Sequence, residues 1–458
     1  MRLRCREAGP AKLVSCLRSG ETPASLMTDA QRHELFQLVN SDSDPTSIAT
    51  ALTSHFQAEN LASGAAVSAY GGEFVWAIKS DSRPHLYVDD EPAPPMDPLP
   101  DNLWVHSRRV RTGTSHAHYY RVDRAVLGGR RFDTAAFGED SYAQDGVPQG
   151  EYSDELFHES PTYRGWKVSY WLYASPGVDP AKPSAVMVWQ DGHRFLERDQ
   201  RSRIAVVVEN LVHKKKVPPM VLVLIAPGYI GSHDNSSSYA PRAVGHMRSL
   251  LYDTFNDDYN KMVVDEIFPE VNKTYRLRDD GYSRAIGGQS SGGICSLNSA
   301  WFRPHAFSRV LSRIGSYASI QWRWGQENPF GEYPLGRFGD RDPCEPLDGG
   351  EIWPFLIRKR DRKNIRIWLE DGTYDLENAH GSWPLQNIQL ANSLKMKEYD
   401  FKFSFGNAQH STTYGDAELP AAMTWLWRDY DPLLTHQTFV MDPDEKDKPY
   451  FRVKICNR

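Results

Sequence analysis

Cysteine is scarce in this sequence, basic residues do not outnumber acidic ones, and long hydrophobic runs are missing. Only five of the 458 residues are cysteine, widely spaced and without a C-x-x-C pair, so neither a disulfide framework nor a zinc site is expected. The formal net charge is −6, which argues against a nucleic-acid partner. No apolar stretch approaches the roughly 18 residues that a membrane helix needs. We therefore expect a cytoplasmic protein with reduced thiols and with no nucleic-acid or membrane partner.

The strand and helix signals change along the chain and indicate several domains. Residues 1–60 have the composition of a short helical lead. Residues 61–150 carry short β-rich segments separated by Gly, Asp and Pro, which predict a small β-sandwich followed by a polar linker. Residues 151–432 alternate strand and helix signals, and residues 433–458 form a tail. A chain of this length has room for two or three domains.

The alternating region predicts an α/β fold with a mainly parallel central sheet covered on both faces. Two runs, Ala185–Trp189 and Val221–Ile225, are apolar throughout, as buried strands should be. A helix is expected over Asp257–Val271. The segment from 325 to 350 favours a long loop, which is either a surface insertion or a functional element. Further strands are predicted at Arg284–Gly287, Ser308–Leu311, Ile365–Leu369 and Tyr399–Phe405.

The strongest chemical signal is Gly288-Gln289-Ser290-Ser291-Gly292, which fits the pattern G-x-S-x-G. In α/β-hydrolases this pattern forms the sharp turn between a strand and a helix that presents a serine hydroxyl. The context agrees, because a strand is predicted before the motif and a helix after it. Glycines suit the strained, closely packed backbone of such a turn. Ser290 would also lie at a helix N-terminus, which favours negative charge, so we expect it to be a nucleophile.

A serine hydroxyl needs a base, and in this fold the order along the chain is nucleophile, acid, histidine. Four histidines follow Ser290: His305, His380, His410 and His436. His410 follows a late strand, and the loop after such a strand reaches the same edge of the sheet as the elbow. His410 is therefore the favoured base, with His380 in reserve.

The acid that orients the imidazole is expected just after the strand Ile365–Leu369. Three acidic residues in this stretch are candidates, namely Asp371, Asp375 and Glu377. Asp375, just past the turn, is the favoured acid. The other two remain alternatives.

Negative charge on an acyl-transfer intermediate is stabilised by two aimed backbone N–H groups, the oxyanion hole. One donor is expected from Ser291, directly after the nucleophile. The second is expected from Asp191 or Gly192, in the loop after the first buried strand. Two neighbouring side chains, His193 and Gln289, are candidates for contact with substrate.

Together these blocks resemble the enterochelin (ferric enterobactin) esterase family, within the esterase D-like group of α/β-hydrolases. The resemblance covers about residues 150–430. It rests on several blocks, each short, that occur in the family's order. They are Val188–Gly192, Tyr252–Thr254, Asp265–Val271, Gly288–Gly293, Arg303–Phe307, Gly315–Tyr317, Asp371–Asp375 and His410–Ser411.

The resemblance implies an α/β-hydrolase domain preceded by an immunoglobulin-like β-domain. It implies a catalytic triad of Ser290, His410 and Asp375, with no cofactor and no metal. It also implies that Arg248 contacts substrate. Leu251, where the family typically has Glu, and the 325–350 insertion both lie where substrate recognition is expected, so they point away from a trilactone siderophore substrate.

We therefore expect a serine carboxylic-ester hydrolase that acts on a small-molecule ester through an acyl-enzyme. One alternative keeps the scaffold and changes the reaction to that of a feruloyl or acetyl-type carbohydrate esterase or an acyltransferase. Another is a non-catalytic binding protein on a hydrolase fold. The oligomeric state is left open.

Overall fold

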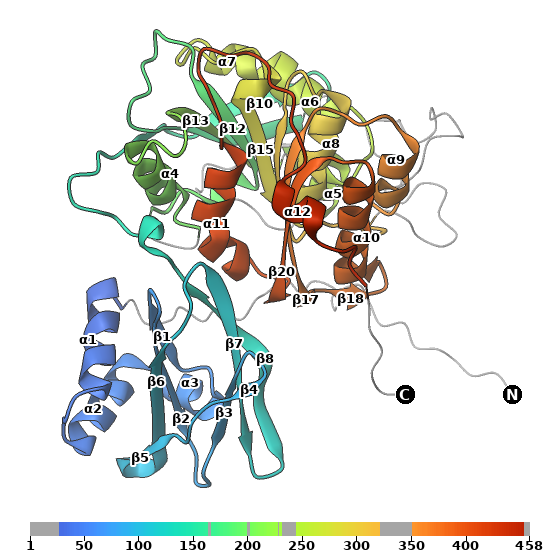
Figure 1. Cartoon of the computed structure of the whole chain (residues 1–458). Coiled ribbons are helices and arrows are strands. Elements are labelled where there is room, and N and C mark those ends of the chain that lie inside the picture. Colours follow the sequence, from blue (N-terminus) through green and yellow to red (C-terminus); the bar gives the residue numbers. More distant parts are fainter. Residues whose placement is uncertain are drawn as a thin grey trace, which may run out of the picture. The chain divides into compact units, whose positions relative to one another are not determined.

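The computed structural model of the chain (Figure 1) divides into two compact units. One unit contains residues 27–110 and 118–132, and the other contains residues 111–117 and the described residues from 133 onward. The loop predicted at 325–350 lies, except for its last residue, outside the described residues. The structure describes residues 27–163, 166–198, 202–227, 229–230, 244–320 and 350–452.

The first unit contains two four-stranded sheets and three helices. One sheet has the strand order β1-β2-β6-β5, and the other has the order β4-β3-β7-β8. An immunoglobulin-like topology for this unit remains a prediction. The strands are β1 (Val67–Tyr70), β2 (Glu73–Lys79), β3 (His85–Val88), β4 (Glu91–Pro92), β5 (Asp97–Leu99), β6 (Leu103–Arg109), β7 (Thr114–Val122) and β8 (Ala125–Ala136). Residues 114–117 of β7 and 133–136 of β8 belong to the second unit. The helices are α1 (Asp29–Val39), α2 (Pro45–His55) and α3 (Ala58–Ser63).

The three helices pack on the first sheet of this unit and do not form a separate lead. Thr28 and Asp44 cap α1 and α2 by accepting hydrogen bonds from the backbone N–H groups of Gln31 and Ser47. The predicted boundary at residue 60 therefore falls inside one compact unit, because the helices bury their apolar faces on the strands. The shared core includes Leu35, Phe36, Ile48, Leu52, Leu61, Val75, Ala77, Leu103 and Val105.

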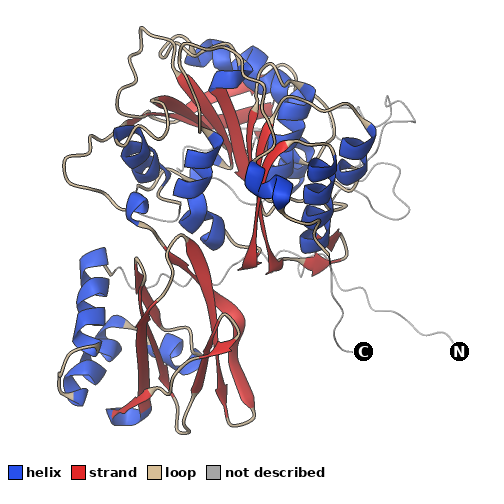
Figure 2. Ribbon diagram, viewed as in Figure 1, coloured by secondary structure: helices blue, strands red, loops and turns tan. Residues whose placement is uncertain are grey.

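The second unit is built around a ten-stranded sheet (Figure 2). Eight strands follow the order β10-β11-β13-β12-β15-β16-β17-β20, and the short strands β9 (Glu151–Tyr152) and β14 (Tyr229–Ile230) pair with β11. The six strands from β13 to β20 in this order run parallel, which confirms the predicted α/β-hydrolase type of sheet. Their bounds are β10 (Leu156–Ser160), β11 (Trp166–Ala174), β12 (Ala185–Gln190), β13 (Met220–Ile225), β15 (Arg284–Gln289), β16 (Arg309–Arg313), β17 (Arg366–Tyr374) and β20 (Asp400–Gln409).

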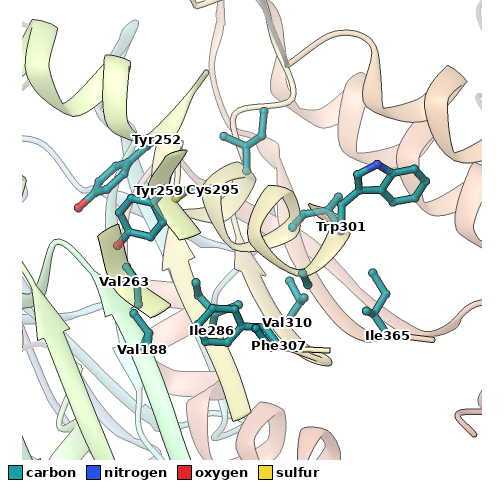
Figure 3. Close-up of a cluster of buried hydrophobic side chains, with 14 of the residues drawn as sticks. Val188, Tyr252, Tyr259, Val263, Ile286, Cys295, Trp301, Phe307, Val310 and Ile365 are labelled. Carbon is teal, nitrogen blue, oxygen red and sulfur yellow. The ribbon is translucent and has the colours of Figure 1, made fainter. Parts of the chain in front are cut away.

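Helices cover both faces of this sheet (Figure 2). Alternate strand residues point to opposite faces, so Val186 and Val188 join one hydrophobic core while Met187 and Trp189 join the other. Figure 3 shows part of the first core, including Ile286 of β15. None of the described helices is both long and apolar enough to cross a membrane. The main helices are α4 (Ile204–His213), α5 (Val244–Tyr252), α8 (Ser291–Phe302), α9 (Trp353–Lys359), α10 (Trp383–Met396), α11 (Thr413–Leu426) and α12 (Pro443–Asp447).

Two stretches of this unit differ from the prediction. The expected linker before residue 151 packs on α4, because the Asn210 side chain donates to the carbonyl oxygens of Asp140 and Tyr142, at 3.0 and 2.7 Å. The single helix expected over 257–271 is divided into α6 (Asp258–Asn260), the π-helical η6 (Lys261–Ile267) and α7 (Phe268–Val271). Pro269 lies at the start of α7, where its missing N–H interrupts the regular hydrogen bonding of an α-helix.

The parallel strands bring three distant loops to one edge of the sheet. Strands β15, β17 and β20 end directly before Ser290, Asp375 and His410. Parallel neighbours have their carboxyl ends at the same edge, which is where open α/β sheets bind their ligands. β17 and β20 pair closely, and a Cβ at Gly372 would lie 2.4 Å from backbone atoms of Ala408. A glycine is therefore required where these two strands lead into the site.

Candidate active site

Ser290 occupies a strained turn between β15 and α8. Its φ is 58° and its ψ is −122°, a conformation that few residues other than glycine adopt. Its backbone N–H donates to the carbonyl of Arg313 at 2.9 Å. A Cβ at Gly288 would lie 2.7 Å from the backbone of Gly292, so the flanking glycines permit the sharp bend. The bend leaves the serine side chain partly exposed at the carboxyl edge of the sheet.

The hydroxyl of Ser290 is linked to two side chains from distant loops. Nε2 of His410 lies 3.0 Å from Oγ of Ser290. Nδ1 of the same ring lies 2.5 Å from Oδ1 of Asp375, whose side chain has no exposed surface. A carboxylate at Nδ1 selects the tautomer that has its proton there, so the lone pair of Nε2 faces the hydroxyl. This is the geometry that a general base for Ser290 requires.

The competing candidates from the sequence occupy other places. His305 and His436 are exposed. Nδ1 of His380 lies 2.9 Å from a backbone carbonyl oxygen in the loop after β16. Glu377 is exposed as well. Among the four histidines that follow Ser290, the structure brings His410 to the hydroxyl.

Asp371 lies beside Asp375 and has no exposed surface. Burial raises the pKa of Asp371 well above its usual value, and the hydrogen bond and charge of Asp375 raise it further. Both effects favour the neutral form of Asp371. Asp375 is the carboxyl group that faces His410, which favours Asp375 as the acid.

The loop after β12 contains the predicted second oxyanion donor. Asp191 has a φ of 56° and precedes a short helical turn, Gly192–Arg194. The N–H of Asp191 donates to the hydroxyl of Tyr252 at 3.2 Å. The second oxyanion donor, from Asp191 or Gly192, remains a prediction. Ser291 begins α8, where the first N–H groups have no acceptor within the helix.

Arg248 pairs with Asp191 at this edge of the sheet. Its Nε lies 2.9 Å from Oδ1 of Asp191 and its Nη2 lies 2.7 Å from Oδ2. Nη2 also donates to the carbonyl of Gln289 at 3.3 Å. Burial opposes ionisation of Asp191, but the Arg248 charge and hydrogen bonds keep the pKa of this carboxyl below its usual value. The guanidinium expected to contact substrate thus ties the loop after β12 to the residue before the nucleophile.

Two further residues that were predicted to contact substrate are buried or half-buried. The Gln289 side chain is only 4% exposed and lines a small cavity with Phe195, Thr412 and Asp416. His193 is half-buried in the turn after Asp191. Substrate contact by either residue remains a prediction.

Comparison with known proteins gives one family. The family model Esterase, described as "Putative esterase", matches residues 164–426. This match covers more than half of the chain. The chain belongs to the Esterase family. Its predicted place among carboxylic ester hydrolases is thereby confirmed, and no curated protein matches it.

Solved structures similar to this esterase include proteins that are named as esterases. The enterobactin esterase FES from Shigella flexneri is 16% identical, with 79% of this chain and 94% of that chain covered and a TM-score of 0.49. The same enzyme in the presence of enterobactin gives 17% identity, the same coverage and a TM-score of 0.49. A ferulic acid esterase from Anaeromyces mucronatus is 15% identical, with 63% and 94% covered and a TM-score of 0.42.

No role was predicted for three residues that lie around Ser290 and His410. Oγ of Ser316 lies 3.0 Å from Oγ of Ser290. The Trp383 ring packs edge-on against His410, with centroids 5.7 Å apart. The backbone carbonyl oxygen of Arg313 accepts a hydrogen bond from the Ser290 N–H. Ser316 lies in one block of the family resemblance. These contacts join residues that are far apart in the chain, so no local sequence pattern predicts them.

Arg313 is a buried cation shared by several acids. Its Nη2 donates to Oδ1 of Asp416 at 2.7 Å and to the carbonyl of Thr412 at 2.8 Å, and its Nε lies 3.5 Å from Oε2 of Glu370. Arg313 forms its main ion pair with Asp416, the closer of the two carboxyl groups. Burial therefore outweighs the Arg313 charge at Glu370 and raises the pKa of Glu370 to about 8. Glu370 is thus protonated at neutral pH in the folded esterase.

Glu370→Gln should make the stability of the esterase less sensitive to pH. Between the usual pKa of Glu, 4.5, and about 8, the folded state binds a proton that the unfolded state releases, so stability falls as pH rises. The variant has no such proton. Thermal unfolding at pH 5.5 and 8.5 should show a smaller loss of Tm in the variant, because the proton on Glu370 is linked to about 3 kcal/mol of stability between these two pH values. The exposed Glu377→Gln is the control, and an unchanged slope in Glu370→Gln would show that Glu370 is ionised when folded.

Proposed function

We propose that the esterase hydrolyses carboxylic esters in two acyl-transfer steps through an acyl-enzyme on Ser290. The observation that carries this proposal is the alignment of Ser290, His410 and Asp375, with His410 bonded to the other two at 3.0 and 2.5 Å. A hydroxyl, a base and an orienting acid in this order are the parts that nucleophilic catalysis by serine needs.

In the first step, Oγ of Ser290 attacks the ester carbonyl carbon while Nε2 of His410 takes the hydroxyl proton. The C–O bond to the alcohol then breaks, and the imidazolium gives the same proton to the departing alkoxide oxygen. Asp375 stabilises the imidazolium that exists between these events. The acyl group remains on Ser290 as an ester.

In the second step, water attacks the acyl-enzyme and His410 takes a proton from it. The C–O bond to Ser290 breaks, and the proton returns from His410 to Oγ. The carboxylic acid leaves and the free serine is restored. In both steps the carbonyl oxygen carries negative charge, which in this proposal the N–H groups of Ser291 and of Asp191 or Gly192 stabilise.

Competition between water and methanol tests for the acyl-enzyme. Phenyl, 1-naphthyl and p-nitrophenyl acetate should all form the same acetyl-enzyme and should give the same ratio of methyl acetate to acetate at a fixed methanol concentration. A ratio that changes with the leaving group would mean that water attacks the ester directly. Hydrolysis without methanol, measured alongside, keeps this outcome separate from an inactive preparation.

A further inference from the structure

The turn after β16 places a second hydroxyl against the nucleophile. Oγ of Ser316 lies 3.0 Å from Oγ of Ser290, and the Ser316 N–H donates to the Ser290 carbonyl at 3.1 Å. The indole Nε1 of Trp383 lies 3.2 Å from Oγ of Ser316. Ser316 and Trp383 are 1% and 2% exposed. Ser316 is therefore held at both its backbone and its side chain, away from solvent.

The chemistry of these groups fixes the direction of each hydrogen bond. An indole N–H can only donate, so the Ser316 oxygen accepts from Trp383. When Nδ1 of His410 donates to Asp375, Nε2 can only accept, so the Ser290 proton goes to His410. The remaining contact, between the two hydroxyls, then has one assignment: Ser316 donates its proton to the Ser290 oxygen.

We propose that Ser316 is a fourth catalytic residue, which donates a hydrogen bond to Oγ of Ser290 and stabilises the negative charge that this oxygen carries in the transition states. This inference rests on the proposed acyl-enzyme. Ser316 keeps its own proton throughout, and the transferred proton moves only between Ser290 or water and His410.

We expect the hydrogen bond from Ser316 to accelerate acylation and deacylation unequally. In the free enzyme Oγ of Ser290 is a hydroxyl oxygen and already accepts well from Ser316. In the acyl-enzyme the same atom is an ester oxygen, which accepts poorly, and it gains charge as the C–O bond breaks. Only an interaction that strengthens toward the transition state accelerates a step, so Ser316 should assist deacylation more than acylation.

The backbone around Ser316 is strained and is held by hydrogen bonds. Both features suit a residue that must hold a hydrogen-bond donor in position. Ile314 has a φ of 42°, which is unfavourable for a β-branched residue. Its N–H donates to the Glu370 carbonyl at 2.7 Å. The Gly315 carbonyl accepts from the Asn387 side chain at 3.0 Å. Strain of this kind persists where the surrounding structure fixes the chain, and it is concentrated at functional sites.

Ser316→Ala tests the proposal, because it removes the hydroxyl and keeps the backbone N–H. We expect kcat for p-nitrophenyl acetate to fall about 10- to 100-fold, the effect of losing one hydrogen bond to a charged oxygen. Labelling by a fluorophosphonate, which needs attack by Ser290 but no deacylation, should slow by less than this. Intact-mass analysis during turnover should show a larger acetylated fraction than in the unaltered enzyme.

Ser312→Ala is the matched control, because Ser312 is also buried and its hydroxyl bonds to Tyr317 at 2.8 Å. It should keep kcat within about threefold. Ser316→Thr, which retains a hydroxyl, should recover part of the lost kcat, and equal Tm values would exclude a folding defect. A Ser316→Ala enzyme with unchanged kcat and unchanged acetylated fraction would overturn the inference. Full turnover by Ser290→Ala would instead overturn the acyl-enzyme itself.

Discussion

Ser290→Ala should lower kcat/KM for p-nitrophenyl acetate by about 10⁴- to 10⁶-fold, the order of magnitude for loss of a triad nucleophile. In the proposed mechanism, the substitution removes the oxygen that forms the covalent bond. Since Ser and Ala tolerate the φ of 58° equally poorly, the turn should remain folded and the loss should be chemical. Equal Tm values for the variant and the unaltered enzyme would check this point.

Ser291→Ala is the neighbouring control for this experiment. The Ser291 hydroxyl donates to Asp253 at 3.1 Å and the residue is buried, so its side chain supports the loop below the site. Its backbone N–H, the proposed oxyanion donor, is unchanged by the substitution. We expect activity within about tenfold of the unaltered enzyme. If Ser290→Ala and Ser291→Ala lost activity to the same extent, the role of Ser290 as the nucleophile would lose its support.

Asp375→Asn should lower kcat by about 10³- to 10⁴-fold, with a smaller change in KM. An amide NH₂ facing Nδ1 of His410 would favour the tautomer with its proton on Nε2, which cannot accept the proton of Ser290. The neutral amide also cannot stabilise the imidazolium. Steady-state kinetics between pH 6 and 9 measure both effects.

The variant Asp371→Asn distinguishes the role of the Asp371 carboxyl group from that of Asp375. Because burial raises the pKa of Asp371 well above its usual value, the neutral form of this carboxyl is favoured, and the uncharged Asn side chain has nearly the same shape. The loss of kcat should therefore be less than about tenfold. An equal loss in Asp371→Asn and Asp375→Asn would show that the negative charge is shared between both residues.

The sequence was sufficient for the features that depend on local patterns. The elbow around Ser290 is a short motif whose glycines meet a local steric need, and the apolar runs of β12 and β13 identify buried strands directly. Chain order then pointed to His410 and Asp375, since the loops after parallel strands share one edge of a sheet. These inferences required knowledge of the type of fold but not of any individual contact.

Contacts between distant segments could not be predicted in this way. The hydrogen bond from Asp191 to Tyr252 spans 61 positions, and no local pattern shows that this amide is already engaged. The same holds for Arg248, whose charge could serve a substrate or a buried acid equally well in the sequence. The boundary at residue 60 was misplaced because α1–α3 look like an independent lead until their core with β2 and β6 is seen.

Peptide mapping after reaction with a fluorophosphonate tests the central claim most directly. The account predicts one phosphonylated residue per chain, Ser290, with no adduct in Ser290→Ala and much slower labelling in His410→Ala. A stoichiometric adduct on any other residue, or labelling of Ser290→Ala at the rate of the unaltered enzyme, would contradict it.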